Sequence, residues 1–137
     1  MCRLFSALLM LLLSPWLVAA SGGDDRPNII VMVADDIGWA DVGFHDGEID
    51  TPSLDRLASE GVELSRFYTT PICSPTRAAL MTGRDPMRLG VVYGVIMPWM
   101  NNGIHPDEHF MPETFLAAGY QTAMVGKWHL GHALQAY

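Results

Sequence analysis

The sequence predicts an α/β protein, because a buried-strand pattern near its start is followed by capped helical patterns and further strand patterns. Residues 27–34 form a continuous, largely β-branched run, typical of a central strand that is covered on both faces in a parallel sheet. Asp35 and Asp36 follow this run directly, and Lys127 and His129 follow a later apolar run. Ligands bind at the carboxyl ends of strands in such sheets, so these four polar residues are candidates for a site.

The first twenty residues differ from the rest of the chain. Arg3 gives a positive start, residues 4–18 are almost wholly apolar, and small residues follow at Ala19 and Ala20. Residues 1–20 are therefore predicted to be a secretory signal peptide, with a membrane anchor as the alternative. Residues 21–26 are expected to form a flexible leader.

The net charge and the cysteine content limit the classes of partner and the cellular compartment that the sequence allows. A formal net charge of −7 argues against a nucleic-acid partner and against a polybasic membrane patch. Cys2 lies in the segment expected to be removed, so Cys73 remains as a lone cysteine, which calls for an explanation other than an internal disulfide. No Asn-x-Ser/Thr sequon occurs, so glycosylation gives no sign of a route through the endoplasmic reticulum, which favours a bacterial periplasm. Because of the predicted signal peptide we expect an exported protein, periplasmic in a bacterium or secreted, and lysosomal if the source is eukaryotic.

Residues 73–84 carry most of the functional prediction. Ser74 suits a helix N-cap, Pro75 suits the first helical position, and Gly83 suits the end of the helix. Cys73 would then lie at the positive end of the helix dipole, where backbone N–H groups attract anions. Arg77, four residues later, can place its guanidinium on the same face of the helix as Cys73. Cys73, the helix N-terminus and this guanidinium together would form a pocket for a tetrahedral oxyanion. The alternatives are a buried structural cysteine and a solvated arginine.

Four further elements are expected along the chain: a helix over residues 51–61, a strand over 62–68, a helix over 111–119 and a strand over 120–125. Thr51 suits the N-cap of the first helix, and Gly119 suits the C-cap of the second. Residues 84–109 are broken by Pro and Gly and are expected to form a loop packed on its own apolar residues. His45, in a loop rich in Gly and Asp, is expected to be solvated.

The two pairs of polar residues suggest complementary chemistry. Adjacent carboxylates repel, so Asp35 and Asp36 call for a cation, and a hard divalent ion such as Ca²⁺ or Mg²⁺ fits oxygen ligands; a polar turn is the alternative. Lys127 and His129 share one face of an extended chain. Lysine supplies a point charge for an oxyanion and histidine transfers protons near neutral pH, whereas a surface loop is the alternative for an isolated pair.

These motifs together resemble those of the type I sulfatases. The match consists of Cys73-x-Pro75-x-Arg77 with the following residues 78–84, the strand that ends in Asp35-Asp36-Ile37-Gly38, a Thr-Pro-x-x-Asp helix start at residue 51, and Gly-Lys-Trp-His-Leu-Gly over residues 126–131. In that family a formylglycine-generating enzyme oxidises the cysteine to formylglycine, whose hydrated aldehyde is the nucleophile. The lone Cys73 is consistent with such a modification.

The resemblance implies the alkaline-phosphatase-like α/β fold, a sandwich with a large mixed sheet between helices, of which residues 27–137 would be the N-terminal part. It implies hydrolysis of a sulfate ester. The implied roles are Ca²⁺ binding, with Mg²⁺ as the alternative ion, by Asp35, Asp36 and the modified Cys73, and charge neutralisation on the sulfuryl oxygens by Arg77 and Lys127. Lys127 and His129 are implied to contact the sulfate and the nucleophile, and His129 to activate or release the covalent intermediate.

Two other readings stay open from the sequence. Phosphonate and phosphodiester hydrolases belong to the same superfamily, and some carry the same modified cysteine. The second alternative is a non-catalytic fragment. Sulfatases have several hundred residues, and their remaining metal ligands, a further His and a second Lys come from later segments. The chain ending at Tyr137 is therefore expected to be a truncated catalytic domain that is inactive alone. The identity of the sulfate ester is not encoded in these motifs.

Overall fold

The structure is a computed structural model that describes residues 25–132 of the chain. The described residues fall into two units, which divide between Val33 and Ala34. The predicted signal peptide and most of the predicted leader lie outside the described residues. Between residues 25 and 132, no helix is long and apolar enough to cross a lipid bilayer.

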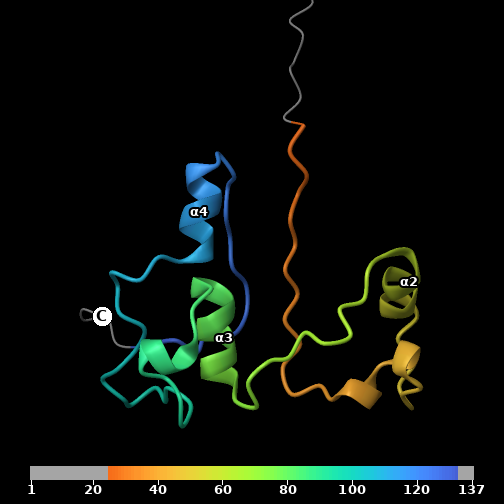
Figure 1. The fold of residues 1–137 in the computed structure, drawn as a ribbon, viewed down its shortest axis with the longest axis horizontal. Helices are drawn as coiled ribbons and strands as arrows, with labels where there is room; N and C mark the ends of the chain where they lie inside the picture. The colour runs from red at the N-terminus through yellow and green to blue at the C-terminus, as the bar shows by residue number, and fades with distance from the viewer. Residues whose placement is uncertain (1–24, 133–137) are drawn as a thin grey trace, which may run out of the picture. The chain divides into compact units, whose positions relative to one another are not determined.

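The regular structure of the described residues is helical (Figure 1). The elements are, in order, η1 (Trp39–Asp41), η2 (Gly43–His45), α2 (Pro52–Glu60), α3 (Cys73–Thr82), η3 (Pro86–Leu89) and α4 (Met111–Ala117). The three α-helices confirm the three helices predicted from capping patterns. Thr51 is the N-cap of α2, as expected, and Gly119 adopts a left-handed φ of 84° just beyond α4.

The start of α3 differs from the prediction. Ile72 is the N-cap and Cys73 is the first helical residue, so Ser74 lies inside the first turn rather than in front of it. The hydroxyl of Ser74 does not cap the helix because it donates to the carbonyl oxygen of His129 at 2.7 Å. The end of the helix is as expected: Gly83 has a left-handed φ of 66°, and its N–H donates to the carbonyl oxygen of Ala79.

The three predicted strands are not formed within the described part of the chain. Residues 27–34, 62–68 and 120–125 contain no strand, and their apolar side chains are open to solvent, as in Ile30 (83% exposed), Val62 (88%) and Val125 (99%). The expected burial of residues 27–34 on both faces is therefore absent here. A strand is stabilised by hydrogen bonds and packing from its neighbours, and residues 25–132 supply no such neighbour.

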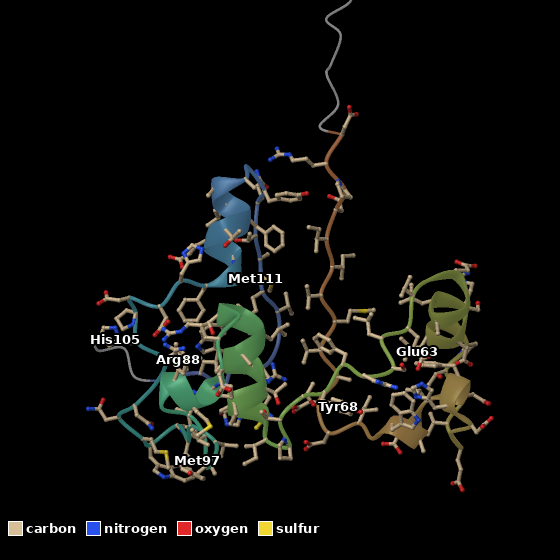
Figure 2. The ribbon with its side chains drawn as sticks, viewed as in Figure 1. Glu63, Tyr68, Arg88, Met97, His105 and Met111 are labelled. Atoms are coloured by element: carbon tan, nitrogen blue, oxygen red, sulfur yellow. The ribbon has the colours of Figure 1, made fainter. Side chains whose placement is uncertain are left out.

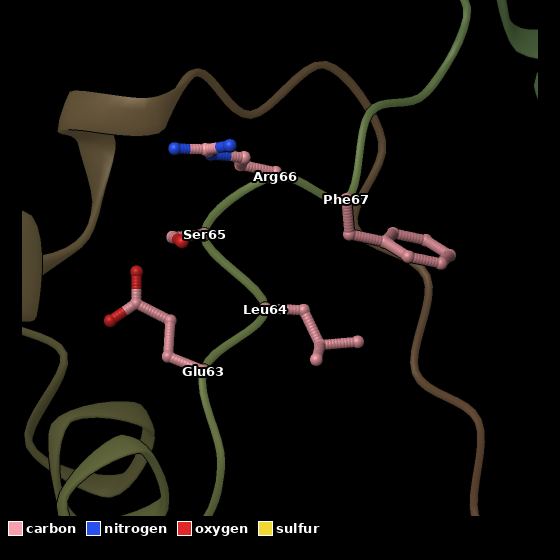
Figure 3. Close-up of a pocket in the computed structure, with 5 residues that line it drawn as sticks. All are labelled: Glu63, Leu64, Ser65, Arg66 and Phe67. Atoms are coloured by element: carbon pink, nitrogen blue, oxygen red, sulfur yellow. The ribbon is translucent and has the colours of Figure 1, made fainter.

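The segment at residues 63–68 is likewise exposed to solvent. Tyr68, labelled with Glu63 in Figure 2, is 85% exposed. Glu63, Leu64, Ser65, Arg66 and Phe67 line a shallow pocket, in which the side chains of Leu64 and Phe67 project away from Glu63 and Arg66 (Figure 3). This pocket contains none of the residues predicted to form the site.

A small core forms beneath α3. Its buried residues are Ala78, Val91, Ile96, Ile104 and Leu130, with Met81, Leu89, Phe110 and Trp128 packed around them. The irregular segment 84–109 contributes Val91, Ile96 and Ile104, which pack against α3 and Leu130, so the expected packing of this loop on its own apolar residues is found only in part. Trp99 in the same segment is 79% exposed. Residues after α4 return alongside α3 (Figure 1), and the N–H of Ile104 donates to the carbonyl oxygen of Leu130 at 3.0 Å. This return brings residues 127–130 to the start of α3.

A second local group joins η1 and η2 to α2. The hydroxyl of Thr51 accepts from the N–H of Gly43 at 2.8 Å and donates to Asp55 at 2.7 Å. His45 is not solvated as expected: its ring stacks on Trp39 at a centroid distance of 3.6 Å, and its Nε2 lies 2.9 Å from Glu63. Its Nδ1 lies 2.9 Å from the carbonyl oxygen of Trp39, so the imidazole holds the loop to the segment after α2.

Candidate active site

The site is built around Cys73, the first residue of α3. Its sulfur lies 3.1 Å from Nδ1 of His129, and this contact joins residues 56 positions apart. Cys73 is half-buried, in the first turn, where the backbone N–H groups have no partner inside the helix. Cys73 therefore lies at a helix N-terminus, as predicted, and His129 places beside it a group that can transfer a proton.

His129 holds an uncommon backbone conformation beside Cys73. Its φ is 61°, in the left-handed region that residues other than glycine seldom adopt. Burial, followed by the charge of Lys127, lowers the pKa of His129 below its ordinary value. The imidazole is accordingly neutral at pH 7, and one ring nitrogen can accept a proton while the other donates one.

Arg77 and Lys127 converge on one carboxylate. Arg77 donates from Nη2 to Oδ1 of Asp35 at 3.3 Å, and Lys127 donates from Nζ to Oδ2 at 2.7 Å. Arg77 also donates from Nη1 to the carbonyl oxygen of Lys127 at 2.5 Å. The Lys127 hydrogen bond is the main reason that the pKa of Asp35 is lowered, and Asp35 in turn raises the pKa of Lys127. Lys127 is therefore charged, and both Lys127 and the Arg77 guanidinium lie next to the Asp35 carboxylate.

Asp36 lies at the bend that ends the apolar run. Its φ is 58°, again in the left-handed region. Conformations of this kind cost free energy and are concentrated at functional sites, where the surrounding structure enforces them. Of the residues predicted from sequence, the structure thus brings Cys73 together with His129, and Arg77 together with Lys127 and Asp35, while Asp36 is adjacent to Asp35 in the chain.

Comparison with known proteins identifies the family. The sulfatase family profile matches residues 27–136, which span every one of these site residues. The chain belongs to the sulfatase family.

Individual sulfatases match the same stretch. The chain is 43% identical over 113 residues to arylsulfatase J of Mus musculus, covering 82% of this chain and 19% of that protein. It is 43% identical over 136 residues to N-acetylgalactosamine-6-sulfatase of Mus musculus, covering 93% and 26%. It is 44% identical over 107 residues to arylsulfatase A of Homo sapiens, covering 77% and 21%. The chain therefore spans about a fifth to a quarter of the length of these curated relatives.

Family membership implies the alkaline-phosphatase-like fold that the motifs predicted. It confirms the resemblance drawn from Cys73-x-Pro75-x-Arg77 and from the Lys127 and His129 segment. The large sheet of that fold is not present among residues 25–132, where the predicted strands are unpaired.

The oxygen atoms of Asp35 and Asp36 are of the type that binds a hard divalent cation. Asp35 and Asp36 offer carboxylate oxygens, the ligands that Ca²⁺ and Mg²⁺ prefer. Asp35 is paired with the cationic side chains of Arg77 and Lys127, so a metal ion at this carboxylate would have to share it with them. Within residues 25–132 no group of three or more His, Cys, Asp and Glu residues gathers around one point. Ca²⁺ usually takes six to eight oxygens, so these two carboxylates would form one part of its shell.

Two residues of the site were missed by the sequence analysis. Ser74, predicted as a cap, is fully buried and binds the backbone of both His129 and Ile96. His132, which the motif did not include, places Nε2 3.1 Å from the carbonyl oxygen of Ile96. Neither contact has a sequence signal, because each partner lies far along the chain and is a backbone group.

Proposed function

We propose that this protein hydrolyses sulfate esters, with a formylglycine made from Cys73 as its nucleophile and a divalent cation held at Asp35 and Asp36. The observation that carries the proposal is the contact of Cys73 with His129 at the start of α3, at 3.1 Å. Membership of the sulfatase family supports the reaction type. The names of the relatives suggest aryl sulfates and sulfated N-acetylgalactosamine as the substrate classes to test first.

The nucleophile position is at residue 73. The sulfur of Cys73 stands where the formylglycine side chain would lie, and the hydrated aldehyde would supply an oxygen nucleophile. His129 is within hydrogen-bond reach of that position and is neutral at pH 7, so its ring can hold or move a proton there. A formylglycine-generating enzyme is the partner that this modification requires.

Positive side chains would stabilise the charge that develops on the sulfuryl oxygens. Arg77 is only 12% exposed and is oriented by two hydrogen bonds, which makes it a preorganised donor. Lys127 adds a second charge beside it. Asp35 and Asp36 would hold Ca²⁺, or Mg²⁺ as the alternative, which when bound would polarise the sulfuryl oxygens as a Lewis acid.

The remaining proposals concern the whole protein. Residues 27–137 would be the N-terminal part of a catalytic domain, in which later strands complete a large mixed sheet between helices. Residues 1–20 would direct export and be removed, placing the protein in a periplasm, outside the cell or in a lysosome. In that domain the exposed runs at 27–34, 62–68 and 120–125 would pair as strands, which accounts for their apolar composition.

A direct assay tests the proposed reaction. The full-length protein, produced with the modifying enzyme, would be given an aryl sulfate and an aryl phosphodiester side by side, with and without a chelator. We expect faster hydrolysis of the sulfate, loss of turnover with chelator and recovery on adding Ca²⁺. Preference for the diester would favour the phosphonate and phosphodiester hydrolases, and no turnover of either would favour a non-catalytic protein.

A further inference from the structure

Ser74 is the only polar residue that is buried among residues 25–132, and it is 0% exposed. Its hydroxyl donates to the carbonyl oxygen of His129 at 2.7 Å and accepts from the N–H of Ile96 at 3.0 Å. A buried hydroxyl with both functions satisfied is costly to remove, because its partners would then lack a hydrogen bond. Ser74 therefore does more than occupy the first turn of α3.

The hydroxyl of Ser74 binds the backbone of His129, whose ring faces the nucleophile position at residue 73. His129 has a left-handed φ of 61°, a conformation that persists only when neighbouring groups hold it. Two adjacent residues of α3 touch it: Cys73 meets the ring at Nδ1, and Ser74 binds the backbone carbonyl. Because the hydrogen bond from Ser74 fixes the backbone of His129, the imidazole has fewer ways to turn away from residue 73.

The contact with Ile96 anchors the same hydroxyl on its other side. Ile96 is 2% exposed and belongs to the core beneath α3. Its N–H donates to Ser74, and its carbonyl oxygen lies 3.1 Å from Nε2 of His132. The loop over residues 84–109, the start of α3 and the segment that carries His129 are thus connected through one buried side chain.

We propose that Ser74 is a positioning residue, which holds the His129 imidazole against the nucleophile position at residue 73. The expected effect of Ser74 on turnover rests on the proposed function. Its expected effect on the position of the His129 ring does not. Its consequence is that loss of the hydroxyl lowers the rate of the chemical step more than it weakens substrate binding. A merely structural Ser74 would instead lower stability and leave the rate per folded molecule unchanged.

Thr76 provides a matched control on the same helix. Its hydroxyl donates to the carbonyl oxygen of Thr70 at 2.8 Å and lies 2.6 Å from the Thr70 hydroxyl. Like Ser74 it carries a hydroxyl in the first turns of α3 that donates to a backbone carbonyl, but that carbonyl lies only six residues away. Neither of its partners is a residue of the candidate site. Thr76→Val removes the hydroxyl and keeps the shape of the side chain.

The experiment uses full-length wild-type protein and the variants Ser74→Ala, Ser74→Thr and Thr76→Val. Mass spectrometry first measures the fraction of residue 73 converted to formylglycine, because Ser74 adjoins it, and rates are expressed per converted site. We expect Ser74→Ala to lower kcat about 10- to 100-fold with KM changed less than about threefold, as a small misplacement of a catalytic group predicts. Ser74→Thr should restore most of kcat, and Thr76→Val should retain it.

A second readout does not depend on turnover. In protein labelled with ¹³C at histidine Cε1, the His129 resonance is assigned by its loss in His129→Gln. Ser74→Ala should displace or split this resonance, and Thr76→Val should leave it in place. If the wild-type protein hydrolyses no sulfate ester, the proposed function fails, while this spectrum still decides the position of His129.

Three results would overturn the proposal. One is wild-type kcat per converted site in Ser74→Ala, another is an unchanged His129 resonance in that variant, and the third is an equal loss of kcat in Thr76→Val. Should Ser74→Ala not fold, Ser74→Cys keeps a weaker hydrogen-bonding group at the position. An intermediate loss of kcat in Ser74→Cys supports the proposal, and wild-type kcat in it contradicts the proposal.

Discussion

The Nδ1 atom of His129 lies 3.1 Å from the sulfur of Cys73, across 56 positions of sequence. In the proposed mechanism His129 would transfer protons at this position, and general acid–base catalysis contributes about 10²- to 10⁴-fold in rate. We expect His129→Ala to lower kcat of the full-length protein by about 10²-fold or more. Steady-state assays with an aryl sulfate measure this.

His105 is the control for that substitution. Its side chain is 69% exposed, and its contacts are with Asp107, two residues away. His105→Ala should therefore retain wild-type kcat. An equal loss in the two variants would contradict a catalytic role for His129.

Conversion of Cys73 to formylglycine is the second prediction. Cys73 is a free, half-buried cysteine in the first turn of α3, within the Cys-x-Pro-x-Arg motif. Peptide mass spectrometry across residues 67–84 should show an aldehyde in place of the thiol when the modifying enzyme is present. Cys73→Ala should abolish turnover. Active protein that contains only the unmodified thiol would refute this prediction.

Arg77 is expected to be sensitive even to a conservative change. Its guanidinium bridges Asp35 and the carbonyl oxygen of Lys127, and a lysine ammonium cannot reproduce that fork. Arg77→Ala should lower kcat by about 10²-fold or more, because a preorganised charge at the sulfuryl oxygens is lost. Arg77→Lys should recover only part of it. Arg88→Ala, a change at an exposed residue of η3, is the control and should leave kcat unchanged.

The sequence predicted those features that depend on neighbours along the chain. The helix ends at Thr51, Gly83 and Gly119 follow from local backbone preferences, so each was found close to its predicted position. The motifs located Cys73 and His129, and the resemblance implied that Lys127 and His129 contact the sulfate and the nucleophile. The return of the chain after α4, which places His129 3.1 Å from Cys73, could not be predicted from the motifs.

Features that depend on distant partners were predicted less well. Ser74 was taken for a cap because serine favours that position, yet its hydroxyl binds a carbonyl 55 residues away. His45 was expected to be solvated because its loop is polar, yet Trp39 and Glu63 hold its ring. The strands were inferred from apolar runs and alternation along the sequence, and a strand forms only where another strand supplies its hydrogen bonds.

His45 predicts a pH dependence of stability. The hydrogen bond to Glu63 is the main reason that the pKa of His45 is raised above its ordinary value. The folded state therefore binds this proton more tightly than the unfolded state. The stabilisation is fully present below the unfolded pKa of about 6.5 and is lost as the pH rises through the higher folded pKa.

Urea unfolding of wild-type and Glu63→Gln full-length protein tests this at about pH 6 and about pH 9, on either side of the histidine transition. The wild-type protein should have the higher midpoint at the lower pH, and the difference should shrink at the higher pH because neutral His45 gains less from a carboxylate. A difference that stays constant between the two values would show that the Glu63 contact is not charge-assisted.

The last prediction concerns a polypeptide confined to residues 21–137. Ile30, Val62 and Val125 are 83%, 88% and 99% exposed, and they lie in three apolar runs that have no paired strand among residues 25–132. Unpaired strand edges and exposed apolar surface favour association between molecules. We therefore expect this polypeptide to aggregate or to remain molten, without chelator-sensitive sulfatase activity.

The test compares residues 21–137 with a longer form that continues into the later parts of a sulfatase domain. Size-exclusion chromatography and thermal unfolding report association and cooperativity, and an aryl sulfate assay with and without chelator reports activity. The longer form should be monodisperse and active, because later strands would cover residues 27–34 and further oxygen ligands would join Asp35 and Asp36. If residues 21–137 alone prove monomeric, cooperatively folded and active, then the site is complete within this chain and the exposed runs serve another purpose.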